Sequence, residues 1–218
     1  MNPFHRRSTK NAFFYVSNAE KVRVRMMNIV KKFPFATLDL GQSKVKMIEL
    51  PYVGDRIVMQ ILIPHEHIKR GESNIDSIFS TIKKEGVDVG SLFNENQKKI
   101  SVNVKLPKFK ITYSRDLSGD LKRQGMKNMF TRGVADFSGI DGTRSLYVSI
   151  VKQDVVIEVN EKGSEAAAAT AVVIINFKSI GLKKEEFFVN QPFLFFIKDK
   201  QTGMLLFLGK IVNPVKMQ

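Results

Sequence analysis

The sequence predicts an α+β protein built mostly from antiparallel strands. Segments in which polar and apolar residues alternate dominate the chain, whereas helical periodicity occurs in only a few places. Several predicted strands are joined by short turns, and no tandem repeat or low-complexity linker divides the 218 residues. Strands joined by short turns pair antiparallel, so the expected sheets are mostly of that kind.

The first half of the chain supplies three of these strands. Residues 21–26 alternate basic and apolar side chains, as a half-exposed strand does. Residues 45–50 and 56–63 flank the turn 52–55, which contains Gly54, and together they predict a hairpin.

Further strands follow. Residues 100–111 alternate, with Pro107 as a break or bulge, and residues 146–159 predict a long strand. Residues 193–197 and 205–212 predict a closing hairpin. The run 192–197 is entirely apolar, so this strand should be covered on both faces.

Helical patterns are fewer. Residues 74–84 place four apolar side chains on one face: Ile75, Ile78, Phe79 and Ile82. Residues 117–130 predict a second helix with four inward positions, Leu117, Leu121, Met126 and Phe130. A short helix is expected within 87–93.

Composition excludes several function classes. No stretch reaches the roughly 18–20 apolar residues that cross a bilayer, so no membrane partner is expected. The absence of Cys excludes disulfides and thiol nucleophiles. His65 and His67 lack a third ligand nearby, so neither a metal nor another cofactor is expected. No nucleophile-elbow motif occurs, which argues against a hydrolase.

The net charge of +14 suggests a polyanion partner, such as a heparin-like glycan. The basic residues are dispersed, however, and no finger, RNA-binding sheet or long basic helix accompanies them. No specific nucleic acid is therefore expected, while glycan binding and a merely solvated basic surface both remain open.

Residues 158–177 form the most informative segment. A strand runs into a turn at Gly163, then into small residues, then into β-branched ones. The small residues could form a short helix, but such a helix is marginal in water and β-branched residues follow at once. In an extended conformation one face is uncharged, and it comprises Ser164, Ala166, Ala168, Thr170, Val172 and Ile174. Such a segment could enter a sheet without burying charge.

This segment, VNEKGSEAAAAT (159–170), resembles the hinge of an inhibitory serpin. Five further stretches resemble that family in the same order: ELPY (49–52) with ILIP (61–64), LPKFK (106–110), ADFSGI (135–140) after Gly125, Met126 and Phe130, PFLF (192–195), and GKIVNP (209–214). The resemblance implies a single partial serpin domain over 1–218, the C-terminal portion of the fold. The family's N-terminal helices and first main-sheet strands would be absent.

The resemblance also implies a mechanism. A reactive-centre loop of about 161–187 would be offered to a serine protease as a substrate, and after cleavage it would insert as a new strand, distorting the protease. The implied hinge comprises Glu161, Gly163, Ser164, Glu165, Ala166, Ala167, Ala168, Ala169 and Thr170. The protein itself would catalyse nothing.

Two adjacent bonds are candidates for cleavage. By family spacing, the scissile residue is Phe177, which makes the bond Phe177–Lys178 and suits a chymotrypsin-like primary pocket. The alternative bond, Lys178–Ser179, would suit a trypsin-like enzyme.

A second hypothesis remains open. Insertion needs two neighbouring strands, and one of them would be almost wholly missing, so the chain could be a truncated, non-inhibitory interaction protein that binds a partner or glycan through its basic surface. The resemblance implies a secreted, extracellular protein. Residues 1–7 contain no signal-like apolar stretch, so a cytoplasmic location is expected if the chain is complete.

Overall fold

The computed structural model describes residues 4–41, 43–65, 74–161 and 184–216. These residues form two compact units. The sheet unit contains the described residues of 1–109 and 158–217, and the ribbon unit contains residues 110–157. Each unit is described by itself.

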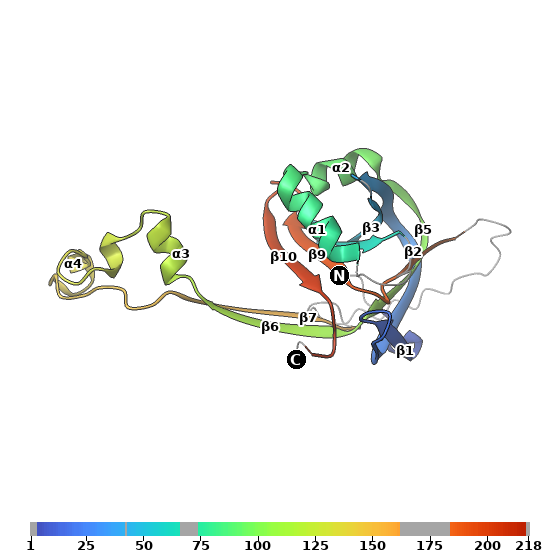
Figure 1. Cartoon of the computed structure of the whole chain (residues 1–218), viewed down its shortest axis with the longest axis horizontal. Helices are drawn as coiled ribbons and strands as arrows, with labels where there is room; N and C mark the ends of the chain where they lie inside the picture. The colour runs from blue at the N-terminus through green and yellow to red at the C-terminus, as the bar shows by residue number, and fades with distance from the viewer. Residues whose placement is uncertain (1–3, 42, 66–73, 162–183, 217–218) are drawn as a thin grey trace. The chain divides into compact units, whose positions relative to one another are not determined.

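The sheet unit is built on one eight-stranded sheet (Figure 1). Its strands run in the order β10-β9-β4-β3-β2-β5-β8, and β1 also pairs with β2. All pairs are antiparallel except β5 with β8. The strands are β1 (Lys10–Tyr15), β2 (Lys21–Leu40), β3 (Ser43–Pro51), β4 (Ile57–Pro64), β5 (Lys98–Pro107), β8 (Glu185–Phe188), β9 (Phe193–Asp199) and β10 (Leu205–Ile211).

Both predicted hairpins are confirmed. β3 pairs antiparallel with β4, and β9 pairs antiparallel with β10. In the β3–β4 turn Gly54 has φ 85° and Asp55 has φ 55°, a left-handed conformation that Gly adopts freely and Asp tolerates. β9 is almost wholly buried, as its apolar sequence predicts.

Two helices cover part of this sheet: α1 (Asn74–Glu85) contacts β2, β4 and β9, and α2 (Val89–Asn96) contacts β2 (Figure 1). The predicted inner face of α1 is confirmed, because Ile75 and Ile78 are fully buried against the sheet. Before α2, the Asp88 carboxylate accepts a hydrogen bond from the Ser91 N–H at 3.1 Å and caps the helix. A single 3₁₀ turn, η1 (Arg6–Ser8), precedes β1. No helix among the described residues is both long and apolar enough to cross a bilayer.

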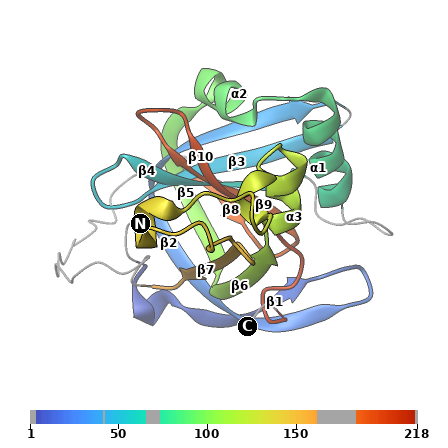
Figure 2. The same cartoon turned by 90° about the vertical axis from the view of Figure 1, so that its left-hand side faces the viewer.

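β2 is far longer than the strand predicted at 21–26. Its first part pairs with β1, forming the hairpin at the bottom of Figure 2, and its last part, from Phe35 onward, pairs with β3. β5 pairs with the middle of β2, from Met26 to Phe35. β2 therefore pairs with β1 and β5 up to Phe35 and with β3 from Phe35 onward, and the change of partner falls next to Pro34.

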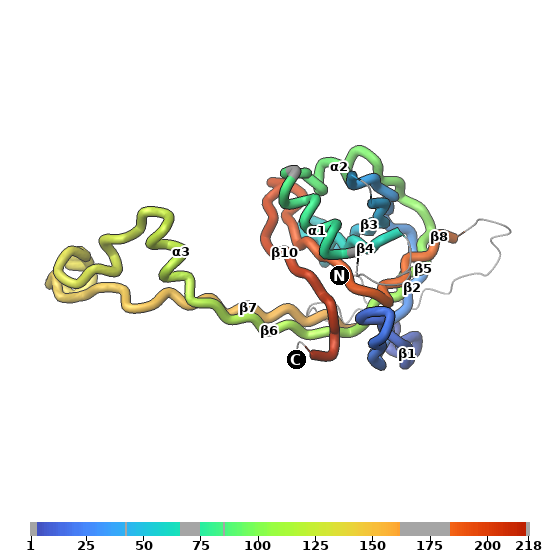
Figure 3. Tube along the Cα trace, in the orientation of Figure 1, coloured from blue at the N-terminus to red at the C-terminus, as the bar shows by residue number. Residues whose placement is uncertain are grey.

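The ribbon unit contains most of a two-stranded sheet, β6 (Phe109–Asp116) with β7 (Lys152–Val159) (Figure 3). Between these strands lie α3 (Ser118–Arg123), η2 (Asn128–Phe130) and α4 (Ser138–Asp141). The break predicted near Pro107 is confirmed, since β5 ends there and β6 begins at Phe109.

The predicted helix over 117–130 is wrong. α3 ends at Arg123, and Gly125 follows with φ 98°, which an α-helix cannot accommodate. Met126, expected to face inward, is 42% exposed.

The predicted strand over 146–159 is wrong in its first part, because β7 begins only at Lys152. The residues before it bond to the helical segment instead of a strand. The Val148 N–H donates to the Met129 carbonyl at 2.8 Å, and the Val151 N–H donates to Ser118 Oγ at 2.9 Å. These bonds occupy the groups that a strand ladder would need.

Candidate functional site

The predicted hinge and scissile bonds lie mostly outside the described residues. Residues 162–183 are not described, and they carry Gly163, Ser164, Glu165, Ala166, Ala167, Ala168, Ala169, Thr170, Phe177, Lys178 and Ser179. Of the predicted site residues the structure describes Glu161. It also describes the strands that enter and leave the segment, so the site can be built from its two anchors.

The entry anchor is Glu161, which is only 8% exposed. Its carbonyl accepts a hydrogen bond from the Phe4 N–H at 3.0 Å. Its carboxylate Oε2 lies 2.7 Å from Lys108 Nζ in an ion pair. Burial alone raises the pKa of Glu161, but hydrogen bonds, above all from Lys108, outweigh it and hold the pKa below the ordinary value of 4.5. Glu161 is therefore an ionised, buried anchor at neutral pH.

The position of Lys108 follows from its neighbours. Pro107 ends β5, and the Lys108 N–H donates to the Arg25 carbonyl of β2 at 2.8 Å. Phe109 is buried beside it, with its ring centroid 5.8 Å from that of Phe193 in an edge-on contact. These contacts fix the backbone on both sides of Lys108, so its ammonium can reach Glu161.

The exit anchor is β8, which sequence analysis missed. It pairs in parallel with β5, from Val102 opposite Glu185 to Lys105 opposite Phe188. Phe187 is fully buried, and its ring meets Phe35 edge-on at 6.3 Å. The predicted loop of about 161–187 therefore has its last three residues inside a strand.

A second ion pair secures β8. Lys46 Nζ of β3 lies 2.6 Å from Glu185 Oε1 and also donates to the Glu186 carbonyl at 3.3 Å. The only sequence signal for this strand was the pair Phe187 and Phe188 after two glutamates, too short to show alternation. Both ends of the segment 162–183 are thus attached to the sheet unit.

β7, the strand that leads to Glu161, has an open edge. Among the described residues β7 pairs with β6 alone, so its other side carries unpaired backbone groups. The ribbon is largely exposed, with Val156 60% and Tyr113 49% exposed. An unpaired edge with exposed apolar side chains can accept a further strand.

Comparison with known proteins defines the family. A family model described as "Serpin (serine protease inhibitor)" matches residues 1–214. The chain is 38% identical over 211 residues to leukocyte elastase inhibitor A of Mus musculus, covering 97% of this chain and 54% of that protein. It is 36% identical over 208 residues to intracellular coagulation inhibitor 2 of Tachypleus tridentatus, covering 95% of this chain and 48% of that protein.

Solved structures agree. The crystal structure of native protease nexin-1 with heparin superposes with a TM-score of 0.72 at 29% identity, covering 98% of this chain and 54% of that one. The chain belongs to the serpin family and has an α+β serpin fold, which confirms the resemblance and the fold class that the sequence predicts. The chain spans about half the length of the curated relatives it matches.

Proposed function

We propose that this chain contributes the reactive loop of a serpin-type inhibitor of a serine protease. In this proposal residues 162–183 form the loop that the protease binds and cleaves as a substrate. The observation that carries the proposal is that both ends of this segment are anchored on the sheet unit, at Glu161 and at β8. A segment held at both ends can be presented to a protease as a fixed substrate loop. In this role the chain performs no catalysis, and residues 1–218 form a single partial serpin domain.

The inhibitory step is loop insertion. The protease serine attacks the carbonyl carbon of the scissile residue, an ester forms, and the new amine end leaves with a proton from the protease histidine. The freed residues 164–174 then reverse at Gly163 and pair antiparallel with the open edge of β7. The uncharged face of this segment supports the step, because no charge has to be buried.

The target is a chymotrypsin-like serine protease that cleaves Phe177–Lys178. The large aromatic side chain of Phe177 suits an apolar primary pocket. A relative named for leukocyte elastase supports a serine protease as the partner class. Cleavage at Lys178–Ser179 by a trypsin-like enzyme is the competing register.

The place of action that we propose is inside the cell. One relative is named an intracellular coagulation inhibitor, and the names of these relatives do not support the extracellular location expected from the resemblance.

A covalent-complex assay tests the proposal. The full-length protein is incubated with chymotrypsin and, separately, with trypsin. Each mixture is then boiled in SDS and separated on a gel. A complex of protease with the cleaved chain is expected with chymotrypsin, and mass spectrometry of the released C-terminal fragment identifies which bond was cut. Clean cleavage with no stable complex from either enzyme would overturn the inhibitory function.

A further inference from the structure

The hairpin formed by β1 and the start of β2 (bottom of Figure 2) has an aromatic outward face. Its other face is buried, with Phe14 fully buried and Val24 6% exposed. An antiparallel hairpin that buries one face normally carries polar side chains on the other. Here Phe13 is 42% exposed, and Tyr15, the next residue on the same face, is 44% exposed. Two adjacent rings left in water are typical of a binding surface.

Basic side chains lie opposite these rings. The register places Arg23 opposite Phe13 and Lys21 opposite Tyr15. Lys21 Nζ lies 4.6 Å from the centroid of the Phe13 ring, and the Arg23 guanidinium carbon lies 6.0 Å from it, so both charges extend over β1. Among the described residues, no carboxylate lies within ion-pair distance of Lys21, Arg23 or Arg25. The outward face therefore combines exposed rings with positive charge that no neighbouring acid neutralises.

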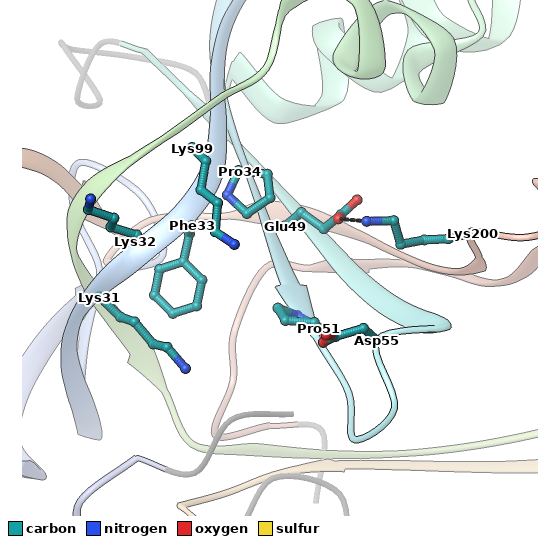
Figure 4. A pocket seen from close by; sticks show the side chains of 9 residues that line it. All are labelled: Lys31, Lys32, Phe33, Pro34, Glu49, Pro51, Asp55, Lys99 and Lys200. Carbon is teal, nitrogen blue, oxygen red and sulfur yellow. Dashed lines mark hydrogen bonds and ion pairs between the residues drawn. The ribbon is translucent and has the colours of Figure 1, made fainter. Parts of the chain in front are cut away.

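The basic hollow beside Pro34 of β2 is arranged differently (Figure 4). There Lys200 Nζ lies 2.9 Å from the carboxylate of the buried Glu49, so one of its charges is already paired. Lys99 lies opposite Pro34, three positions from Lys31, so these two lysines occupy opposite faces of the sheet. Only on the β1–β2 hairpin, of these two places, do the unpaired cations share one face.

The outer edge of β1 can accept a further strand. Among the described residues β1 pairs with β2 alone. The Tyr15 N–H donates to the Asn190 carbonyl at 2.8 Å, so it points away from β2. Every second residue of a strand points its backbone groups the same way, so the N–H and C=O groups of Asn11 and Phe13 also point away from β2. In the described part of the chain no backbone hydrogen bond outside the β1–β2 ladder involves Asn11 or Phe13, which leaves their outward groups available for pairing.

We propose that β1 binds an extended, acidic segment of a partner protein as an additional strand. The backbone of this segment pairs with the outward groups of Asn11 and Phe13. A strand beside β1 lies about 4.8 Å away, so its carboxylates can accept hydrogen bonds from Lys21 and Arg23, which already extend over β1. An apolar side chain of the segment contacts the exposed rings.

The open edge favours a polypeptide over other acidic partners. Its alternating N–H donors and C=O acceptors match the backbone of another strand, whereas a sulfated glycan or a phosphorylated small molecule offers no such ladder. None of these residues takes part in the proposed inhibition, so this inference does not depend on it.

The probe is a synthetic peptide of about six residues, the usual length of a strand, with the sequence Glu-Thr-Val-Thr-Glu-Thr and capped ends. In an extended conformation it presents two carboxylates and one apolar side chain on the same face. Isothermal titration calorimetry measures its binding to the full-length protein at two salt concentrations. It should bind with a dissociation constant below about 1 mM, and more weakly at the higher salt concentration.

A pair of variants at one position tests the backbone pairing. Asn11→Pro removes the outward N–H, and proline is tolerated in an edge strand where its nitrogen faces outward. It should weaken peptide binding about fivefold or more, because a hydrogen bond is lost. Asn11→Ala keeps the N–H but also removes the side-chain oxygen, which accepts a hydrogen bond from Arg25 at 3.4 Å. It should change the affinity less than twofold.

A second pair tests the charge without altering the backbone. Arg23→Gln changes an exposed side chain and should weaken binding up to about fivefold. Lys31→Gln removes one positive charge from the same strand, at the hollow of Figure 4, where β2 pairs with β5. This control should change the affinity less than twofold.

Three results would overturn the proposal. The first is no binding of the peptide at about 1 mM, the weakest range of specific recognition. The second is an equal loss in Asn11→Pro and Asn11→Ala, or a loss of heparin-hexasaccharide binding in Asn11→Pro as large as that of peptide binding, because backbone pairing would then not be the cause. The third is an equal loss in Arg23→Gln and Lys31→Gln, because the peptide would then be held by diffuse charge.

Discussion

Replacing Lys108 by Met should destabilise the chain through Glu161. The two side chains form an ion pair of 2.7 Å in which the Glu161 side chain is 10% exposed and that of Lys108 is 38% exposed. Breaking a fully buried pair by removing one partner costs about 3–5 kcal/mol. Water can reach the Lys108 end, so we expect a loss of about 2 kcal/mol in the free energy of unfolding at pH 7.

The loss should depend on pH in a defined direction. The pKa of Glu161 is depressed below 4.5 in the folded chain, so the ion pair stabilises fully above that pH and its contribution is lost as the pH falls through the folded value. Without Lys108, Glu161 loses the hydrogen bond and the positive charge that lower its pKa, so burial should leave the pKa of Glu161 higher in the variant than in the original chain. The stability difference between the two proteins should therefore be larger at pH 7 than at pH 4.

Urea unfolding followed by far-ultraviolet circular dichroism at pH 7 and pH 4 measures this difference. Lys110→Met is the matched control, because Lys110 is exposed and lies two residues further along. The double variant Lys108→Met with Glu161→Gln should recover part of the lost stability. The reasoning is refuted by a loss no larger than that of the control, or by equal losses at the two pH values.

Three further predictions concern the core and the loop. Gly209→Ala should destabilise the chain by about 1–3 kcal/mol, because the added Cβ would clash with Cε1 of the buried Phe195 ring. Gly139→Ala, whose added Cβ would have no atom within 4 Å, should be near neutral in the same unfolding assay. Ala168→Arg should convert inhibition into substrate turnover, because insertion would bury a charge; the ratio of complex to cleaved product on an SDS gel measures this, and an unchanged ratio would contradict it. Phe177→Ala should slow complex formation with chymotrypsin at least about tenfold by removing a large apolar contact, and an unchanged second-order rate would favour the Lys178–Ser179 register.

Local sequence patterns predicted two hairpins of the sheet unit and the buried face of its first helix. The hairpins β3–β4 and β9–β10 were predictable because their strands adjoin in sequence and are fully apolar or alternate. The inner face of α1 was predictable for the same reason, since Ile75 and Ile78 lie one turn apart.

Features that depend on distant segments were not predictable. β8 has four residues and exists because β5, about eighty residues earlier, offers it a parallel edge. The prediction of a helix over 117–130 was wrong because Gly125 adopts a positive φ. A glycine within a helical pattern does not show from the sequence alone which conformation it adopts.

The candidate site divides in the same way. The hinge is visible in the sequence because its small residues form an unusual run, and Glu161 was found with it. Lys108 and Lys46 were not found as its anchors, because each ion pair joins residues more than fifty positions apart.

The central claim is that residues 164–174 become a strand beside β7 once the loop is cut. The most direct measurement is the thermal unfolding of the full-length protein before and after cleavage at Phe177 or Lys178, with the Ala168→Arg variant cleaved in parallel. We predict that Tm rises on cleavage by about 2–4 °C for each kcal/mol that the new strand contributes, and that the variant gains far less. An unchanged Tm for the cleaved full-length protein would contradict insertion.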